Sequence, residues 1–181
     1  LLSYIKAMQE RLTYSVLQEF ARSKLINRVY LVDNLKLEDI VGDVPLKTYY
    51  KQLNSLLVPA FHMVNVLNHS QPIINTFSEP NVTANIATLG ISDLEEGEER
   101  SFFDMEYERE SVYYYAINND SLQSDGALFK KIRQQIRQKS SEDEQKTCSY
   151  GIFATNYDTN YVYFIKYATL VQGQIILEPP P

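Results

Sequence analysis

The sequence lacks the residues on which several large classes of protein depend. Its 181 residues include one cysteine and two histidines, which excludes an internal disulfide framework and leaves little material for a zinc centre. No apolar run approaches the roughly 18 residues that cross a bilayer, and no secretory leader pattern occurs at the start. The net charge of −6 argues against general nucleic-acid binding, which needs a basic surface. We therefore expect a cytoplasmic protein with no metal site of its own and no direct contact with membrane or nucleic acid.

The common motifs of catalysis and phosphate binding are also absent. The sequence contains no GxxxxGK[ST], GxGxxG, GxSxG or HExxH motif. His62 and His69 lie seven residues apart without a third ligand, and Cys148 precedes a predicted strand. We interpret the two histidines as ordinary surface or core residues and Cys148 as a small buried hydrophobic residue. The chain begins at Leu1 already in a helical pattern, so we expect it to be part of a longer protein.

What is present is a series of helical and strand patterns. Apolar residues at spacings of three and four predict a helix from Leu2 to about Ser23. The apolar, β-branched run Val29–Val32 predicts a buried parallel strand. A long helix is predicted from about Leu46 to His69, with Asp43 as its N-cap and Pro45 in its first turn. Pro59 should kink or break this helix.

The second half of the sequence contains more strand patterns. Three of them are expected to share a second sheet, separate from the first strand: Val112–Ile117, Tyr150–Ala154 and Tyr161–Thr169. Asn156–Asn160 suggests a hairpin turn between the last two. We also expect a short helix over 81–88, a strand over 89–94 and a helix over 127–139. The pattern predicts an α/β protein with a central long helix followed by a mixed-sheet α+β second domain.

Charge and tyrosine are unevenly distributed. Asp93–Glu110 holds nine acidic residues against two arginines, and such runs are usually solvated loops, with partner binding as the alternative. The sequence contains 14 tyrosines. We interpret them mainly as strand residues, with a contact surface as the alternative. The basic residues of the helix at 127–139 are expected to form its solvated face.

One pair of residues suits a nucleobase. Tyr50 and Asn54 are four residues apart on the long helix and therefore share a face. A ring can stack on a base, and an amide offers both a donor and an acceptor. Asn34 follows the predicted parallel strand, where α/β sheets bind ligands. Such a pair also occurs by chance in many helices.

The order of these motifs resembles the tubulin/FtsZ superfamily, including tubulins of the TubZ type. The resemblance is carried by Val29-Tyr-Leu-Val-Asp-Asn34, by Tyr50-Lys-Gln-Leu-Asn54 and by the later series of elements. It implies a tail of the nucleotide-binding domain with the central helix over 1–70, a C-terminal assembly domain over 71–178 and a disordered tail over 179–181. The glycine-rich phosphate loop of the family is missing, so the chain would be the C-terminal half of a protein about twice as long.

The resemblance also implies roles for particular residues. Asn34 and Asn54 would hydrogen-bond the guanine of GTP and Tyr50 would stack on it, with Mg²⁺ bound in the full-length protein. The loop over about 74–81 would enter the next subunit's nucleotide pocket. Counting back from Gly90, its catalytic positions would fall on Ser78 and Asn81, or on Asn85 by a tubulin-like count, and Glu79 is the nearest acid that could substitute. An asparagine cannot act as a general base, so GTP hydrolysis would depend on Glu79.

These expectations combine into one function and its rivals. The chain would be the C-terminal portion of a GTP-dependent filament-forming protein whose main partner is itself, assembled head to tail. It would position DNA, a plasmid or a phage, with a DNA-bound adaptor as a second partner. The alternatives are a stand-alone α/β interaction module without nucleotide and a tubulin-like scaffold that does not hydrolyse GTP.

Overall fold

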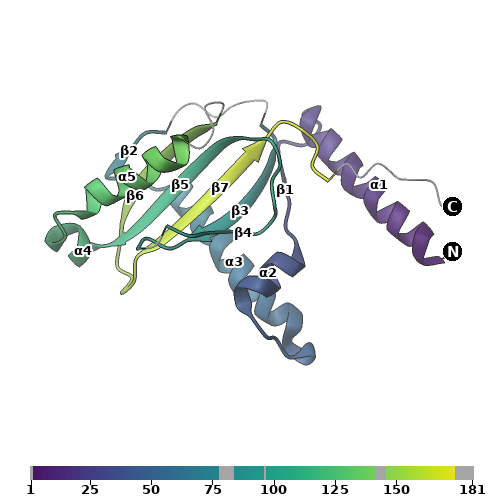
Figure 1. Ribbon diagram of the computed structural model, residues 1–181, viewed down its shortest axis with the longest axis horizontal. Helices are drawn as coiled ribbons and strands as arrows, with labels where there is room; N and C mark the ends of the chain where they lie inside the picture. The colour runs from purple at the N-terminus through teal and green to yellow at the C-terminus, as the bar shows by residue number, and fades with distance from the viewer. Residues whose placement is uncertain (1, 78–83, 96, 142–145, 174–181) are drawn as a thin grey trace.

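The computed structural model describes residues 2–77, 84–95, 97–141 and 146–173 (Figure 1). A mixed sheet lies at the centre, α3 and α5 lie against it, and α1 extends away from it. The elements are α1 (Leu2–Arg22), β1 (Val29–Tyr30), α2 (Asn34–Val41), the 3₁₀ turn η1 (Leu46–Thr48), α3 (Tyr49–Asn68), β2 (Ile74–Asn75), β3 (Ile86–Ser92), β4 (Glu99–Ser101), β5 (Glu108–Asn118), α4 (Asn119–Ser124), α5 (Leu128–Ser141), β6 (Thr147–Thr155) and β7 (Tyr161–Ala168).

The sheet combines parallel and antiparallel pairs, as the sequence predicts. Its strands lie in the order β1-β3-β7-β5-β6-β2, and β4 pairs with β3. β1 is parallel to β3 and β5 is parallel to β6, whereas β7 is antiparallel to both of its neighbours. The three strands predicted to share a sheet do so. The expectation that the first strand belongs to a different sheet is wrong, because its backbone pairs along β3 as far as Leu31, whose N–H donates to the Ala87 carbonyl at 2.8 Å.

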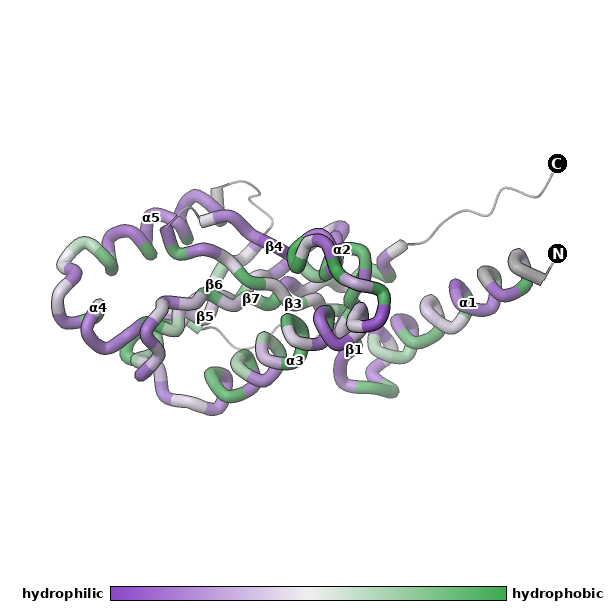
Figure 2. The backbone as a smooth tube through the Cα atoms, turned by 90° about the horizontal axis from the view of Figure 1, so that it is seen from below, coloured by the Kyte–Doolittle hydropathy of each residue, from purple (hydrophilic) through white to green (hydrophobic). Residues whose placement is uncertain are grey.

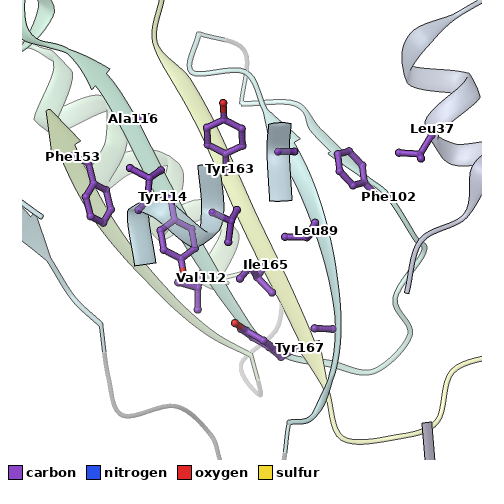
Figure 3. Close-up of a cluster of buried hydrophobic side chains, with 14 of the residues drawn as sticks. Leu37, Leu89, Phe102, Val112, Tyr114, Ala116, Phe153, Tyr163, Ile165 and Tyr167 are labelled. Carbon is purple, nitrogen blue, oxygen red and sulfur yellow. The ribbon is translucent and has the colours of Figure 1, made fainter. Parts of the chain in front are cut away.

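Both faces of the sheet are covered by apolar layers. Successive residues of β5 alternate between them: Val112, Tyr114 and Ala116 belong to the layer beneath α3, which Figure 3 shows. Tyr113 and Tyr115 belong to the layer beneath α5. This alternation is the period of two that a strand imposes on its side chains. It supports the interpretation that tyrosine fills strand positions.

The last two strands do not form the predicted hairpin. β7 lies between β3 and β5, so β5 separates it from β6. The connection over 156–160 therefore passes the end of β5, and Asn118 at that end holds it. The Asn118 backbone N–H donates to Asn160 Oδ1 at 2.8 Å, and its side-chain amide donates to the Tyr157 carbonyl. The turn residues were recognised correctly, but they join strands that are two positions apart.

Two further elements differ from the prediction. The helix expected over 81–88 is wrong for 84–88: residues 84 and 85 are not helical, and β3 begins at residue 86, where it pairs with β1 on one edge and β7 on the other. Residues 81–83 lie outside the described residues. The sequence analysis did not predict α2. It begins because the Asp33 carboxylate accepts a hydrogen bond from the Leu35 N–H at 2.9 Å, which is an N-cap.

The long helix begins later than predicted and runs without a break. Asp43 is not its N-cap, since the helix is preceded by the 3₁₀ turn η1, whose N-cap is Pro45. α3 then continues from Tyr49 to Asn68 with Pro59 inside it. Of the kink or break expected at Pro59, the break does not occur. The buried residues on either side of it, Leu53 and Val64, pack into the same layer and hold both halves against the sheet.

The acidic segment is only partly a solvated loop. Glu95, Glu98 and Glu106 are exposed, as predicted. Glu99 lies on β4 and Glu108 on β5, and both are largely buried in ion pairs. The interpretation of this segment as a solvated loop is therefore wrong for those two residues, because strand pairing brings them beside lysines that are distant in sequence.

Candidate functional site

The three residues predicted to contact a base lie on the helices α2 and α3. Asn34 is the first residue of α2, and Tyr50 and Asn54 lie one turn apart near the start of α3. The turn before α2 is fixed to the sheet region, because the Asp33 N–H donates to the Phe102 carbonyl at 2.7 Å. All three side chains are exposed, and the Tyr50 residue is 69% exposed.

A tyrosine–glutamate contact joins the two helices at this point. The Tyr49 hydroxyl donates to Glu38 Oε2 at 2.9 Å, and this hydrogen bond, together with desolvation, raises the pKa of Tyr49. Glu38 is four residues after Asn34, so these two share a face of α2. The Tyr49 ring meets the Tyr50 ring edge-on at 5.2 Å between centroids. Asn34 therefore lies on the face of α2 that meets the start of α3.

The arrangement can contribute one side of a base-binding site. An exposed ring offers a stacking surface, and two amides offer hydrogen-bond donors and acceptors for the edge of a base. The site is an open surface in the described residues. A bound nucleotide would need further contacts for its sugar and phosphates.

The segment predicted as the catalytic loop begins as an edge strand. Ile74–Asn75 is β2, antiparallel to β6. The Ile73 N–H donates to the Ile152 carbonyl at 2.7 Å, and the Thr76 N–H donates to the Tyr150 carbonyl at 2.8 Å. The start of the segment is thereby tied to the sheet. Glu79 and Asn81 lie outside the described residues.

Asn85, the alternative catalytic position, has a structural role. It is 7% exposed, and its side-chain amide donates to the Ala21 carbonyl at 2.8 Å. Its own carbonyl accepts from the Val29 N–H at 3.0 Å. Asn85 therefore joins the end of α1 and β1 to the start of β3, and its amide does not face solvent.

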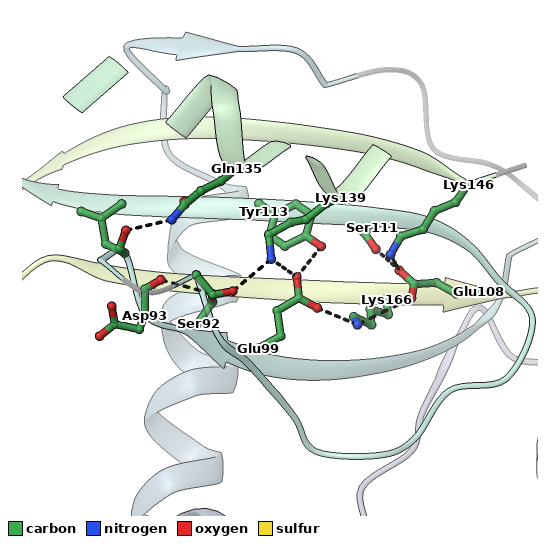
Figure 4. Close-up of polar contacts among 12 residues, drawn as sticks. Ser92, Asp93, Glu99, Glu108, Ser111, Tyr113, Gln135, Lys139, Lys146 and Lys166 are labelled. Carbon is green, nitrogen blue, oxygen red and sulfur yellow. Dashed lines mark hydrogen bonds and ion pairs between the residues drawn. The ribbon is translucent and has the colours of Figure 1, made fainter. Parts of the chain in front are cut away.

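The sequence analysis missed a network of charges beneath α5, which Figure 4 shows. Lys166 on β7 lies between two carboxylates, 2.7 Å from Glu99 Oε2 and 3.6 Å from Glu108 Oε2. Lys139 on α5 also pairs with Glu99, and Lys146 lies 2.8 Å from Glu108 Oε1. The two glutamates belong to the acidic run that the sequence shows, but their lysine partners are distant in sequence, so the pairing could not be predicted.

The network shifts the pKa of Glu99. Burial by itself raises the pKa of this carboxyl, but the charge of Lys166 and the hydrogen bonds from Lys139 and Lys166 outweigh burial and lower the pKa to about 2. The Tyr113 hydroxyl also donates to Glu99 Oε1 at 2.7 Å. Glu99 is therefore a fixed anion that joins β4, β5, β7 and α5.

Arg28 and Glu110, which the sequence did not single out, line one cavity beside α3. Glu110 belongs to the acidic run, and its buried position could not be recognised because it depends on an irregularity in β5. Within the described residues, no group of three or more histidine, cysteine or acidic side chains could hold a metal ion. No helix of that part of the chain is both long and apolar enough to span a membrane.

Comparisons with known proteins identify the fold. The chain matches no protein-family model and no curated protein. It is similar to an FtsZ dimer from M. jannaschii, with a TM-score of 0.56 and 16% identity over 84% of this chain and 51% of that one. It is also similar to a GTPγS-form protofilament of TubZ from Bacillus thuringiensis serovar israelensis, with a TM-score of 0.56 and 14% identity over 87% and 47%. CetZ from Methanosaeta thermophila matches with a TM-score of 0.52 and 14% identity over 79% and 43%.

These matches confirm the predicted fold, which is of the tubulin/FtsZ type. The chain spans about half the length of the structures it matches. The division of the chain near residue 70 stays a prediction, as do the roles of the candidate site residues.

Proposed function

We propose that this chain is the C-terminal portion of a tubulin/FtsZ-like, GTP-dependent filament-forming protein. The supporting observation is the fold that it shares with TubZ, whose structures are described as protofilaments and as a two-stranded filament. Subunits would stack head to tail, which is the kind of contact that propagates without closing. The filament would act in the cytoplasm to position DNA, a plasmid or a phage, with a DNA-bound adaptor as a second partner.

In this proposal, residues 1–70 complete the nucleotide-binding domain and residues 71–178 form the assembly domain. The open surface at the start of α2 and α3 fits one face of a guanine. Tyr50 offers its exposed ring for stacking, and Asn34 and Asn54 offer amides to the edge of the base. The chain contains no glycine-rich phosphate loop, so the phosphates and their Mg²⁺ would be held by another part of the polypeptide.

Glu79 and Asn81 would face the nucleotide of the neighbouring subunit. Glu79 would orient the attacking water and accept its proton, which Asn81 cannot do. A scaffold that binds GTP without hydrolysing it is the second candidate. The hydrogen bonds between residues 73 and 76 and β6 favour this candidate. They hold β2 against the sheet and so restrict how far the loop after it can extend towards a neighbouring subunit.

Assembly and binding of GTP by the complete polypeptide test the proposal. We expect sedimentable filaments with GTP and none with GDP. Tyr50→Ala and Asn54→Ala should each weaken GTP binding by about 1–3 kcal/mol, through lost stacking and through an unsatisfied hydrogen bond to the base. Equilibrium titration with labelled GTP measures the change in affinity.

Val58→Ala is the matched control, because Val58 is 60% exposed on the same helix and lies outside the proposed site. It should leave the affinity unchanged. Equal GTP affinity in the parent protein and in both site variants would remove these residues from the site. A protein that neither binds GTP nor assembles would favour the stand-alone interaction module.

A further inference from the structure

A cavity of about 290 Å³ lies between the second half of α3 and the sheet. Aromatic side chains form much of its wall, among them Tyr30, Phe61 and Tyr114. Arg28 and Glu110 bring opposite charges to the same lining. The volume is at the lower end of the range of roughly 300–1,000 Å³ that is typical of ligand sites. It therefore suits a molecule of amino-acid size and is small for a guanine nucleotide.

An irregularity in β5 directs Glu110 towards this cavity. In the pairing with β7, Glu108 is opposite Ala168 and Glu110 is opposite Tyr167, so one residue of β5 is extra. Two residues at positions 108 and 110 of a regular strand would point to the same face. The bulge separates them: Glu108 joins the lysine network beneath α5, and Glu110 lies on the α3 side.

Glu110 is a largely buried residue whose carboxylate has no partner among the described residues. The residue is 7% exposed. Unlike Glu108, which pairs with Lys146 and Lys166, Glu110 has no hydrogen bond or ion pair from its side chain to any residue that the structure describes. Burying a carboxylate in this way is costly unless a cation or hydrogen-bond donor reaches it. Its position in the wall of a cavity leaves room for such a group.

Arg28 stands in the same cavity, and its charge is not neutralised either. Its guanidinium lies over the Tyr167 ring at 4.6 Å from the centroid, and Nη1 donates to the Tyr167 hydroxyl at 3.3 Å. Its Nε is buried and has no hydrogen-bond partner among the residues that the structure describes. Within the described part of the chain, Arg28 and Glu110 are not within the 4.0 Å of an ion pair. The space between them could be bridged by a molecule that carries both charges.

We propose that this cavity binds a small zwitterion with an apolar or aromatic body, of the size of an aromatic amino acid. Its ammonium group pairs with Glu110, and its carboxylate receives hydrogen bonds from the Arg28 guanidinium, which is suited to carboxylates. The aromatic wall contacts the body of the ligand and adds a favourable surface for the ammonium. This site is distinct from the surface at Tyr50 and does not depend on nucleotide binding.

Three related probes separate the two charges. L-Tryptophan carries both, tryptamine lacks the carboxylate and indole-3-propionate lacks the ammonium. Titration calorimetry on the full chain should show binding of L-tryptophan, or of L-tyrosine, L-phenylalanine or L-leucine in the same panel. The probes that lack one charge should bind about 10- to 100-fold more weakly, because hydrogen bonds to charged groups contribute strongly to affinity.

Substitutions test the residues. Glu110→Gln and Arg28→Gln should each weaken binding of the zwitterion by about 10- to 100-fold, whereas Glu106→Gln, the same change at an exposed carboxylate, should not. Thermal unfolding without ligand gives an independent readout: Glu110→Gln should leave the midpoint unchanged or raise it, since it removes an unpartnered buried charge. Failure of every zwitterion to bind, equal binding by tryptamine, or a midpoint lowered by Glu110→Gln would overturn the proposal.

Discussion

The charges beneath α5 are the clearest case in which single residues set a property of the whole protein. Glu99 is held by Lys139 and Lys166, and its pKa is lowered to about 2 from an ordinary value of 4.5. Burial opposes this shift, so the lysines must outweigh it. A carboxyl whose pKa is lower in the folded state stabilises the fold above its unfolded pKa. It loses that contribution as the pH falls through its folded pKa.

The expected result is a pH-dependent difference between the parent protein and Glu99→Gln. At pH 7 the variant should be less stable by roughly 3–4 kcal/mol, since the pKa is lowered from 4.5 to about 2 and a pKa unit corresponds to about 1.4 kcal/mol. The difference should narrow as the pH falls from about 4.5 towards 2, where the parent carboxyl becomes protonated. Urea unfolding at several pH values measures it. A difference that stays constant over this range would mean that the ion pairs do not account for the effect.

At Gly90, close packing of the neighbouring strands leaves no room for a side chain. A Cβ atom at Gly90 would overlap the Phe164 ring and lie 2.7 Å from the Arg100 carbonyl oxygen. Gly90→Ala should therefore reduce the free energy of unfolding by about 1–3 kcal/mol, as overpacking does. Gly126→Ala is the matched control, because a Cβ there meets nothing within 4 Å. Chemical denaturation measures the free energy of unfolding of both variants. If Gly90→Ala is as stable as Gly126→Ala, β3 and β7 can move apart enough to accept the methyl group without loss of stability.

At the same scale, the sequence predicted only part of the candidate site. Tyr50 and Asn54 could be paired because a helix places residues four apart on one face, and Asn34 because it follows a strand. Glu110 and Arg28 could not be paired. Their proximity depends on a β-bulge and on strand order, and neither leaves a local pattern in the sequence.

At the scale of elements, α3 keeps its helical course through a proline. Proline in a helix removes one backbone hydrogen bond and crowds the preceding turn, which destabilises the helix by about 3 kcal/mol or more. Pro59 is exposed, so its side chain adds little buried surface. The layer formed by Leu53, Ala60 and Val64 against the sheet is what keeps the helix continuous.

Pro59→Ala should accordingly stabilise the protein. We expect the free energy of unfolding to rise by about 1–3 kcal/mol, because the variant regains a helical hydrogen bond and the gain exceeds the greater entropy of the unfolded chain. Val58→Ala, at an exposed neighbour, should change it by less than about 0.5 kcal/mol. Thermal and urea unfolding provide the measurement. A destabilised Pro59→Ala variant would indicate that a bend at this position is required.

Element types were more predictable than their connections. The strands β5, β6 and β7 were found because aromatic and β-branched residues gather in short runs. The hairpin between β6 and β7 was wrong because strand order is set by which edges meet in three dimensions. The sequence near Asn156–Asn160 describes a turn, and it contains no information about the strand that lies between.

At the scale of the whole molecule, α1 carries several large apolar side chains that are exposed. Its C-terminal half contacts the rest of the protein, in part through two buried amide hydrogen bonds: Gln18 Nε2 donates to the Gln172 carbonyl at 3.1 Å, and the Gln172 N–H donates to Gln18 Oε1 at 2.7 Å. The helix extends away from the sheet, with hydrophobic and hydrophilic residues alternating along it (Figure 2). Its apolar stripe is 37–65% exposed and consists of Ile5, Met8, Leu12, Val16 and Phe20.

A continuous exposed apolar stripe of this kind is typical of a surface that another polypeptide covers. In the proposed filament protein, the rest of the nucleotide-binding domain would cover it. The 181-residue chain by itself should then self-associate as its concentration rises, and Leu12→Lys, in the middle of the stripe, should reduce this association. Leu46→Lys is the control: Leu46 is 91% exposed but lies on η1, away from the stripe, so it should have no effect. Sedimentation velocity over a range of concentrations distinguishes the two variants. If Leu12→Lys leaves the association intact, the contact between copies lies elsewhere on the chain. The exposed stripe of α1 would then no longer support the proposal that the rest of the nucleotide-binding domain packs on it.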